Sequence, residues 1–537
     1  MGLRPEIEKI RIPLLKLSTK DIPVRAFSNI INGSKWFWTV WFLSITLTAV
    51  IHLTTLTISP TIWGDEVDIV EMGRTSIFEP NTCWSINWLS NNRPYNPIFY
   101  IGPGLQEFAF RLSAYSPFGP RISSLLGALA AATITVAWLR TMGISPIFSL
   151  MLGLIFLLDP VFVSGYRGAR VDSWAIALCI TSCCLLRHAA KHTKKIYFFG
   201  GWVLAGGFAA TALMTWLPAI ILFPLIAAEG FEISKSFKNV LKIKLIVSAI
   251  AGAAVTLIFL LAPLWTQSSF LLIGLSKHVG MSTRVASNSV YLQLLNSLRA
   301  WAGSPFVPIV AIVGLFNRRN TVLAIFSGLT FLSIILFTNV YVHRLVYFLP
   351  YMIALIAGFY QNITTINAQS SYHSWRSGQI VLFLLLIWAI SVSMIARPLT
   401  ALSQKNERSP QLLLNAGREW IGGGPQKVYL GCNEFYYAGR ALGWHMFRII
   451  IDQPVQVIKE LLSKVDYAIM PSKGISTDIS DLLLGAGLHY TATFNAYVGS
   501  SPSVNLISRF SAQPYSSYAV YSRQGENSSD NANKTKE

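Results

Sequence analysis

Acidic residues are scarce in this chain of 537 residues, and over one long stretch they are absent. Only 12% of the residues are charged, about half of the roughly 25% that soluble globular proteins carry. Between Ile233 and Asn406 the sequence has no Asp or Glu. The chain is therefore not an ordinary soluble protein. Any reaction that needs a carboxylate must take it from the first half of the chain or from the C-terminal region.

Cysteine is also rare, which argues against a disulfide-rich or zinc-binding protein. The five cysteines show no zinc-ligand spacing. Cys179, Cys183 and Cys184 lie inside an apolar run and are predicted to be small core residues. Cys83 and Cys432 are both expected on the extracytoplasmic side. They could form a disulfide, which the sequence alone does not establish.

Long apolar runs, by contrast, are abundant. Hydrophobic residues make up 53% of the chain and the mean hydropathy is +0.48. A run of about 18 residues can cross a hydrocarbon core about 30 Å thick. We therefore predict an all-α polytopic membrane domain with about eleven transmembrane helices, several of them short or tilted. The predicted spans are 36–58, 122–139, 144–158, 173–186, 197–215, 217–231, 245–265, 301–316, 321–339, 345–359 and 380–396.

The net charge of +19 comes from basic residues that cluster between the apolar runs. This pattern is typical of cytoplasmic loops and of surfaces facing anionic lipid, and it argues against nucleic acid as a partner. It places the N-terminus in the cytoplasm with the basic clusters at 187–195, 235–244 and 318–319. The first apolar run is too long for a signal-peptide core and lacks a cleavage site, so we read it as a retained span. An odd number of crossings then puts the chain from Arg397 onward outside.

Four parts are predicted in chain order: a cytoplasmic segment at 1–35, a transmembrane domain at 36–396, a small extracytoplasmic α/β domain at 397–523 and a disordered tail at 524–537. Eleven of the 24 acidic residues lie beyond residue 396. Strand-like runs appear there at 427–430, 467–470, 490–494 and 518–521, and a helix-like run at 455–462. The tail is polar and without aromatic residues, a composition typical of disorder.

The first external loop, at 59–121, contains an apolar segment that we do not read as a span. Residues 97–115 include Gln106, Glu107 and Arg111 and look amphipathic, which favours a helix lying in the membrane interface. A true span here would break the positive-inside pattern of the next two loops. Glu107 and Arg111 are four residues apart and are predicted to form a structural ion pair.

Two adjacent carboxylates, Asp65 and Glu66, follow the first span at the start of a short helical pattern. A structural interpretation is that acids in a first helical turn are stabilised by the helix dipole. The functional interpretation is that ionisable groups near a bilayer are costly and usually serve chemistry. We favour function, with Asp65 as a general base. Together with Asp68 and Glu71 the pair could also hold Mg²⁺ or Mn²⁺, although the chemistry proposed requires no metal or other cofactor.

Arg167, Arg170 and Asp172 are the second group of candidates. The two arginines are three residues apart, so in a helix they would share a face, and two guanidinium groups there would suit a phosphate. The alternative is a span flanked by interfacial anchors, with an Arg170–Asp172 ion pair. His343 and Arg344, at the outer start of a later span, offer further cations, although a lone cation at a helix end is more often only snorkelling.

These motifs resemble the membrane glycosyltransferases of the GT-C superfamily that use polyprenyl-phosphate sugars, such as lipid A aminoarabinose transferases and protein O-mannosyltransferases. The resemblance covers roughly residues 35–396. Its elements are Trp63-Gly64-Asp65-Glu66 in the first external loop, Asn96-Pro97-Ile98-Phe99-Tyr100, Arg170-Val171-Asp172 and Arg344-Leu345-Val346-Tyr347-Phe348-Leu349-Pro350. One departure follows the acidic pair, where Val67, Asp68 and Ile69 replace the aromatic or small residues that are common in this class.

The resemblance implies a multi-pass enzyme, of a bacterial inner membrane, that moves a sugar from a polyprenyl-phosphate donor to a lipid, glycan or protein acceptor on the extracytoplasmic side. Such transfer is usually inverting. Asp65 would take the acceptor's proton, and Glu66 would orient or tune it. The donor's phosphate and sugar would be bound by five residues, Arg167, Arg170, Asp172, His343 and Arg344.

The alternative function is a polytopic lipid or solute transporter or flippase. Transporters place ionisable groups near the bilayer midplane, often at broken helices in repeated halves. This chain places its acids at the outer margin and shows no internal repeat, which favours the enzyme. A third interpretation, a scaffold for envelope assembly, predicts that Asp65 and Glu66 tolerate replacement together.

Overall fold

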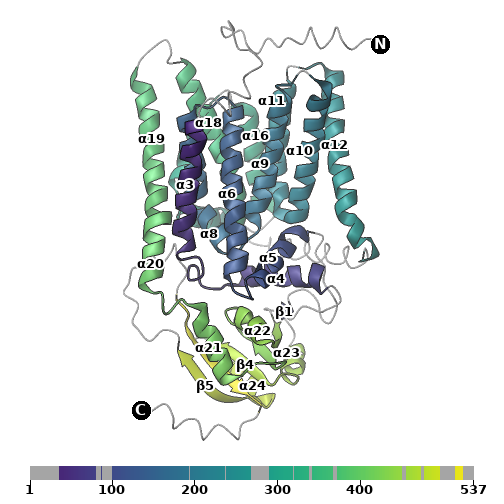
Figure 1. The fold of residues 1–537 in the computed structure, drawn as a ribbon, viewed down its shortest axis with the longest axis vertical. Helices are drawn as coiled ribbons and strands as arrows, with labels where there is room; N and C mark the ends of the chain where they lie inside the picture. Colours follow the sequence, from purple (N-terminus) through teal and green to yellow (C-terminus); the bar gives the residue numbers. More distant parts are fainter. Residues whose placement is uncertain are drawn as a thin grey trace.

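Long apolar helices form a bundle in the upper half of the computed structural model, with a smaller mixed domain below it (Figure 1). The structure describes residues 35–79, 86–87, 99–192, 194–235, 237–267, 290–317, 320–337, 342–366, 372–449, 455–472, 477–495 and 514–523. Residues 1–34 of the predicted cytoplasmic segment, the predicted disordered tail, Cys83, Arg318 and Arg319 lie outside these ranges. The possible disulfide between Cys83 and Cys432 therefore involves a residue outside the described part of the chain.

Each of the eleven predicted apolar runs coincides with one or more helices. Six helical segments are long and apolar enough to cross a membrane, or seven if the bent pair α7 and α8 counts as one span. The remaining apolar helices are shorter, so a count of eleven crossings stays a prediction. The bundle helices are α3 (Lys35–Leu53), α6 (Phe118–Thr141), α7 (Pro146–Leu158), α8 (Pro160–Arg167), α9 (Asp172–Ala189), α10 (Lys195–Thr215), η3 (Leu217–Leu222), α11 (Phe223–Ser234), α12 (Asn239–Leu261), η4 (Ala262–Gln267), α14 (Val290–Trp301), α15 (Phe306–Leu315), α16 (Thr321–Phe337), α17 (Val342–Leu345), η7 (Val346–Phe348), α18 (Leu349–Ile366), α19 (Tyr372–Ile390), η8 (Ser391–Ala396) and α20 (Arg397–Ser403).

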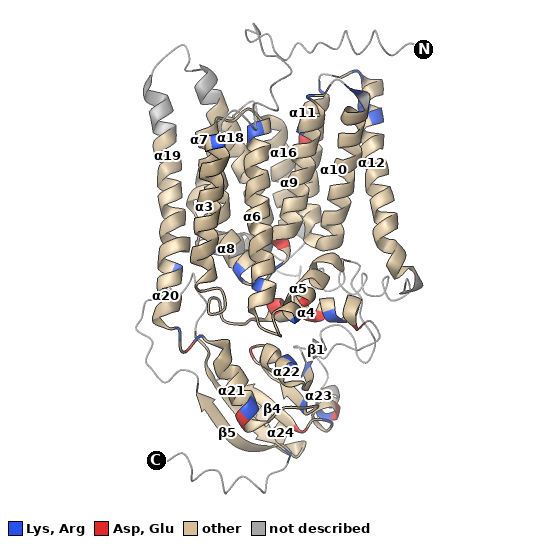
Figure 2. Ribbon diagram, in the orientation of Figure 1, with Lys and Arg blue, Asp and Glu red and all other residues tan. Residues whose placement is uncertain are grey.

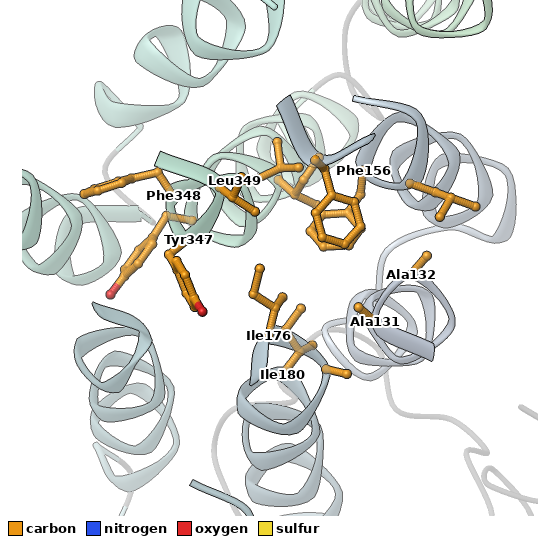
Figure 3. Close-up of a cluster of buried hydrophobic side chains, with 14 of the residues drawn as sticks. Ala131, Ala132, Phe156, Ile176, Ile180, Tyr347, Phe348 and Leu349 are labelled. Atoms are coloured by element: carbon orange, nitrogen blue, oxygen red, sulfur yellow. The ribbon is translucent and has the colours of Figure 1, made fainter. Parts of the chain in front are cut away.

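The core of the bundle is apolar and tightly packed. Figure 3 shows side chains from α6, α7, α9 and the η7–α18 segment converging on one cluster, with Phe156, Ile176 and Ile180 near its centre. Elsewhere small residues bring helices together: a Cβ on Gly206 of α10 would lie 1.8 Å from the backbone oxygen of Ala249 in α12. Close backbone approach through small residues is the usual way membrane helices pack.

A break in one apolar segment shapes the end of the bundle that faces the C-terminal domain. Helices α7 and α8 meet at a bend of 54°. Asp159 caps α8 by accepting a hydrogen bond from the backbone N–H of Val161 at 2.9 Å, and its other oxygen accepts one from Ser304. Pro160 begins the new helix, where its missing N–H has no cost. The chain is thereby turned so that the segment after α8 lies at the bundle's end.

The C-terminal domain is built on a six-stranded sheet of order β1-β3-β2-β4-β6-β5. Its elements are α21 (Pro410–Trp420), β2 (Lys427–Leu430), α22 (Tyr436–Leu442), β3 (His445–Ile449), α23 (Val455–Leu462), β4 (Tyr467–Pro471), α24 (Thr477–Gly485), β5 (His489–Asn495) and β6 (Ser517–Ser522). The first four strands of that order are parallel, and β6 and β5 join antiparallel. The α/β character predicted for this region is confirmed. The edge strand β1 (Ile86–Asn87) comes from the first external loop.

Three short helical segments of the first external loop lie between the bundle and the C-terminal domain (Figure 1). They are α4 (Gly64–Gly73), η2 (Arg74–Phe78) and α5 (Ile101–Leu112). The segment predicted as an interfacial helix at 97–115 is helical over twelve residues, and its place in the membrane interface stays a prediction. Val67, Val70 and Phe110 of this layer share one buried apolar cluster with Tyr436 and Leu413 of the C-terminal domain. The domain is therefore packed onto the loop and not merely tethered to it.

Charge is distributed unevenly along the long axis of the molecule (Figure 2). Acidic (red) and basic (blue) segments gather on α4 and α5, between the bundle and the C-terminal domain. The middle parts of the bundle helices are almost entirely tan, which marks residues other than Lys, Arg, Asp and Glu. The opposite end of the bundle carries mainly basic residues, among them Arg140 and Arg187. This is the end that the positive-inside pattern predicts to be cytoplasmic.

Candidate active site

Asp65 stands in the first turn of α4, at the boundary between the bundle and the C-terminal domain. Its side chain is 45% exposed and forms an ion pair with Arg170, which lies in the connection between α8 and α9. Trp63, two residues before Asp65, donates its indole N–H to the backbone oxygen of Gly168 at 3.3 Å. The loop after α3 and the loop after α8 are therefore joined at this point, and Asp65 is held there with one face open.

Glu66, the neighbouring carboxylate, is fully buried and points elsewhere. Its two oxygens accept hydrogen bonds from Nε and Nη2 of Arg121 at 2.8 Å each, a bidentate pair in which neither side chain is exposed. Arg121 also donates to the backbone oxygens of Leu56, Thr57 and Pro60. The pair thus fastens α4 to the start of α6 and to the chain that leaves α3.

Arg170 is shared by two carboxylates. Its Nε donates to Asp172 Oδ2 at 2.6 Å, and its Nη1 contacts Asp65. The Arg170–Asp172 ion pair, one of the alternatives open from the sequence, is therefore confirmed. Tyr347 lies beside the same pair. The first external loop, the α8–α9 connection and the η7 segment meet here.

The predicted placement of Arg167 and Arg170 on one helix face is wrong. Helix α8 ends at Arg167, and Ala169 takes a left-handed backbone conformation with φ of 54°, which breaks the three-residue spacing. Arg167 instead turns back to the end of α3. It is fully buried there and donates to the backbone oxygens of Ser59, His52 and Thr55. These carbonyls belong to the last turn of α3 and to the chain that follows it, so Arg167 fastens the end of α8 to the end of α3.

Arg344 lies in α17, which contacts α8, and its side chain is half-buried. The motif that contains it therefore comes to the same end of the bundle as Arg170. His343 is part of the same short helix, but its side chain lies outside the described part of the chain. The phosphate role predicted for both residues stays a prediction.

A network of buried charges joins α4 and α5 to the C-terminal domain. Glu71 pairs with Arg74 at 2.5 Å and accepts a hydrogen bond from the Tyr436 hydroxyl at 2.5 Å. On α5, Glu107 pairs with Arg111 at 2.7 Å, as predicted, and with Arg440 of α22 at 2.8 Å. Burial by itself would raise the pKa of Glu71, but Arg74 and the other partners outweigh it and lower that pKa to about 2. Glu71 is thus a fixed negative charge.

Asp68 differs from the other acids of α4. It is 9% exposed, and its Oδ1 has no hydrogen-bond partner among the described residues. Burial, with Asp65 and Glu71 nearby, raises the pKa of Asp68 to about 7, although Arg448 of β3 opposes the rise. The four carboxylates of α4 therefore point to different partners and do not converge on one point. Glu66 pairs with Arg121, Glu71 with Arg74 and Asp65 with Arg170. Over the described ranges no three His, Cys, Asp or Glu side chains come together as a metal site would require.

Sequence reasoning missed Arg121 and Arg440. Arg121 is the ion-pair partner of buried Glu66, and Arg440 is that of buried Glu107. For Arg121 a signal was present, because an arginine directly before an apolar run sits where burial is costly and a partner is needed. Arg440 had no such signal. It is one of several basic residues in a soluble-like region, and only the tertiary fold brings it to Glu107.

The fold is similar to those of two solved proteins, ArnT and AftD. No protein-family model and no curated protein matches the sequence. Among solved structures, ArnT from Cupriavidus metallidurans bound to undecaprenyl phosphate matches with a TM-score of 0.53 at 12% identity, over 92% of this chain and 99% of that chain. The same protein in the apo state matches with a TM-score of 0.52 at 12% identity, over 90% and 98% of the two chains.

A third structure, the arabinofuranosyltransferase AftD from Mycobacteria, matches with a TM-score of 0.53 at 13% identity, over 91% of this chain but 41% of that chain. The resemblance drawn from the sequence is therefore confirmed as a likeness of fold. It extends beyond residues 35–396 and includes the C-terminal domain, because a match over 92% of 537 residues cannot be made by the bundle alone.

Proposed function

We propose that this chain is an integral membrane glycosyltransferase that transfers a sugar from a polyprenyl-phosphate carrier to an acceptor on the extracytoplasmic side. The observation that carries the proposal is the end-to-end likeness to ArnT, whose solved structure holds undecaprenyl phosphate. That likeness is joined by a half-exposed carboxylate at the outer margin of the bundle. The N-terminus is then cytoplasmic and the C-terminal domain extracytoplasmic, as the basic end of the bundle supports.

In this reaction an acceptor hydroxyl or amine attacks the anomeric carbon of the donor sugar, and the bond from that carbon to the lipid phosphate breaks. The acceptor's proton goes to a general base, a contribution typically of about 10² to 10⁴ in rate. Attack from the face opposite the leaving phosphate inverts the anomeric carbon and forms no covalent intermediate with the enzyme.

Asp65 is the residue best suited to be the base. Its carboxylate is 45% exposed, whereas Glu66 has no exposed surface and both of its oxygens are bonded to Arg121. A base must reach the proton that it removes, so geometry favours the exposed member of the pair. Glu66 would act by fixing the position of α4, and hence of Asp65.

Arg170 is the cation best placed for the leaving phosphate, since it already contacts Asp65. As charge develops on the leaving phosphate, one edge of the Arg170 guanidinium would donate hydrogen bonds to it, while Nε of the same group still donates to Asp172. Arg344 would be a second cation from α17. Arg167 is removed from the donor site in this proposal, because it is buried against the end of α3.

The proposal is tested by reconstituting the chain in nanodiscs with undecaprenyl phosphate carrying a radiolabelled sugar and with cell-envelope extract as acceptor. The wild type should release undecaprenyl phosphate and label the extract, and Asp65→Asn should reduce the rate by about 10² or more. Glu460→Gln, on an exposed side chain of the C-terminal domain, is the matched control and should transfer at the wild-type rate. Undiminished transfer by folded Asp65→Asn would remove Asp65 from the base role.

A further inference from the structure

The carboxyl ends of strands β2 and β3 in the C-terminal domain lie against the part of α4 that carries Asp65 and Asp68. The chain runs from β2 through α22 to β3 on one side of β2, and then through α23 to β4 on the other side. The direction of the connections therefore reverses between β2 and β4. In open sheets of parallel strands, ligands bind outside the carboxyl ends of the strands at this reversal.

Several polar side chains near that position have a buried atom with no hydrogen-bond partner among the described residues. The Oδ1 atom of Asn433, just after β2, and the Oγ atom of Ser472, just after β4, are buried and have no hydrogen-bond partner in the part of the chain that the structure describes. The same is true of Nη1 of Arg448, the penultimate residue of β3, and of Oδ1 of Asp68. Buried polar atoms are nearly always hydrogen-bonded, so such a group calls for an explanation.

The strand ends are in direct contact with the acidic motif. A Cβ on Gly64 would lie 2.6 Å from Nδ2 of Asn433, so a glycine at this position is what lets the Asn433 amide touch the first turn of α4. Asp68 is one turn further along the same helix and interacts electrostatically with both Asp65 and Arg448. Asn433 therefore touches the helical turn that carries Asp65, and Arg448 interacts with Asp68 one turn further along.

The chemistry of the group suits an uncharged, hydroxyl-rich ligand. It combines an amide, a hydroxyl, a carboxyl and a guanidinium, which together can donate to and accept from sugar hydroxyls. It is a poor site for an anion, because Arg448 is accompanied by two acidic side chains, Asp68 and Glu434. Burial raises the pKa of both acids, to about 7 for Asp68, and the Arg448 guanidinium opposes that rise.

We propose that Asn433 and Arg448, at the carboxyl ends of β2 and β3, together with Asp68 of α4, form the subsite that binds the carbohydrate of the acceptor and directs its nucleophile to Asp65. This inference rests on the proposed function and adds to it the acceptor class and a division of labour. The donor is bound on the bundle side of α4, at Arg170, and the acceptor on the side of the C-terminal domain. These three residues are positioning residues, since they hold the acceptor and take no part in proton transfer.

The kinetic test compares Asn433→Ala and Arg448→Ala with Glu460→Gln in nanodiscs. Both variants should raise the acceptor KM about ten-fold or more, because they remove partners of buried hydroxyls. The donor KM and the slow hydrolysis of donor by water should stay within two-fold of wild type. An equal loss of hydrolysis and of transfer, or an unchanged acceptor KM, would overturn the subsite.

A binding test separates failure of the subsite from failure of the proposed function. Methyl glycosides of arabinose, mannose and glucosamine are titrated into the full-length protein without donor, with inorganic phosphate as the anionic probe, and saturation-transfer NMR is recorded. Glycoside binding that is lost in Asn433→Ala and Arg448→Ala supports the subsite even if no lipid-linked sugar is ever transferred. Absence of glycoside binding, equal binding by the variants, or displacement by phosphate would overturn it while leaving glycosyl transfer intact.

Discussion

The bundle and the layer beneath it are held together in opposite ways. Within the bundle, aliphatic and aromatic side chains fill the centre (Figure 3). Helices α10 and α12 approach each other through glycine. In the layer of α4, η2 and α5, buried carboxylates and guanidinium groups pair with one another and with Arg440 of the C-terminal domain. The bilayer tolerates few charges. The acids therefore concentrate where the chain leaves the apolar region, and there they fasten the fold and leave one carboxylate, that of Asp65, half-exposed.

The largest structural effect is expected from breaking the Glu66–Arg121 pair. Arg121→Ala leaves Glu66 buried without its cation and frees three backbone carbonyls, which should cost about 3–5 kcal/mol. Thermal unfolding in detergent, followed by tryptophan fluorescence, measures the loss. Replacing both residues by apolar ones, Glu66→Met with Arg121→Leu, should recover part of it. A single variant as stable as the wild type would show that charge does not hold the layer.

A comparable effect should follow from acidification. Because the pKa of Glu71 is lowered from 4.5 to about 2, its stabilising contribution is complete above pH 4.5 and is lost as pH falls toward 2. The shift corresponds to a contribution on the order of 3 kcal/mol. Asp68 acts in the other direction. Because its pKa is raised from 3.8 to about 7, protonated Asp68 contributes most to stability below a pH of about 4, and this contribution is lost as the pH rises through 7.

The two acids are separated by subtracting the unfolding curves of Glu71→Gln from those of the wild type between pH 3 and 7. The difference should shrink as pH falls. A difference that is constant across this range would mean that Glu71 is not held as an anion by Arg74 and Tyr436.

A smaller effect is expected in the bundle. A Cβ on Gly206 would meet the backbone of Ala249, so Gly206→Ala must push α10 and α12 apart and should cost about 1–3 kcal/mol. Gly200→Ala on the same helix is the control, because nothing lies within 4 Å of its added Cβ. The control should unfold at the wild-type temperature or slightly above it. Equal stabilities would argue against close packing of the two helices.

The smallest effect is expected at the rim of the charged layer. Arg111 and Glu79 are paired at 2.8 Å, but they are 31% and 38% exposed. Solvent screens such pairs, so Glu79→Gln should cost at most about 1 kcal/mol and less in high salt. Urea or thermal unfolding at low and high ionic strength measures this. A loss as large as that of Arg121→Ala would erase the distinction between buried and rim charges.

The elements that the sequence predicts well are those with a strong local pattern. Apolar runs of membrane-spanning length locate the bundle helices, and alternating apolar residues locate β2 at 427–430, where the predicted bounds match. Strand β3, at His445–Ile449, was missed because only its context in the sheet selects it. The pairing of β1 with β3 joins residues that are more than 350 positions apart, and no local pattern contains it.

The candidate site divides in the same way. Asp65 and the Arg170–Asp172 pair could be picked out by residue type and position, and the structure brings them together. The burial of Glu66 and the turn of Arg167 toward α3 could not, since both depend on partners supplied by the fold. Two adjacent acids in one motif look alike in sequence. Their roles separate only when α4 points one at Arg121 and leaves the other half-exposed.

The most direct test of the account therefore compares the two acids of α4. Asp65→Asn and Glu66→Gln are purified in parallel, and transfer per folded molecule and the unfolding temperature are both measured. Asp65→Asn should lose about 10² to 10⁴ in transfer rate with little change in unfolding temperature, whereas Glu66→Gln should unfold earlier and keep most of its transfer per folded molecule. The reverse pattern, with catalysis lost in folded Glu66→Gln and retained in Asp65→Asn, would contradict the account.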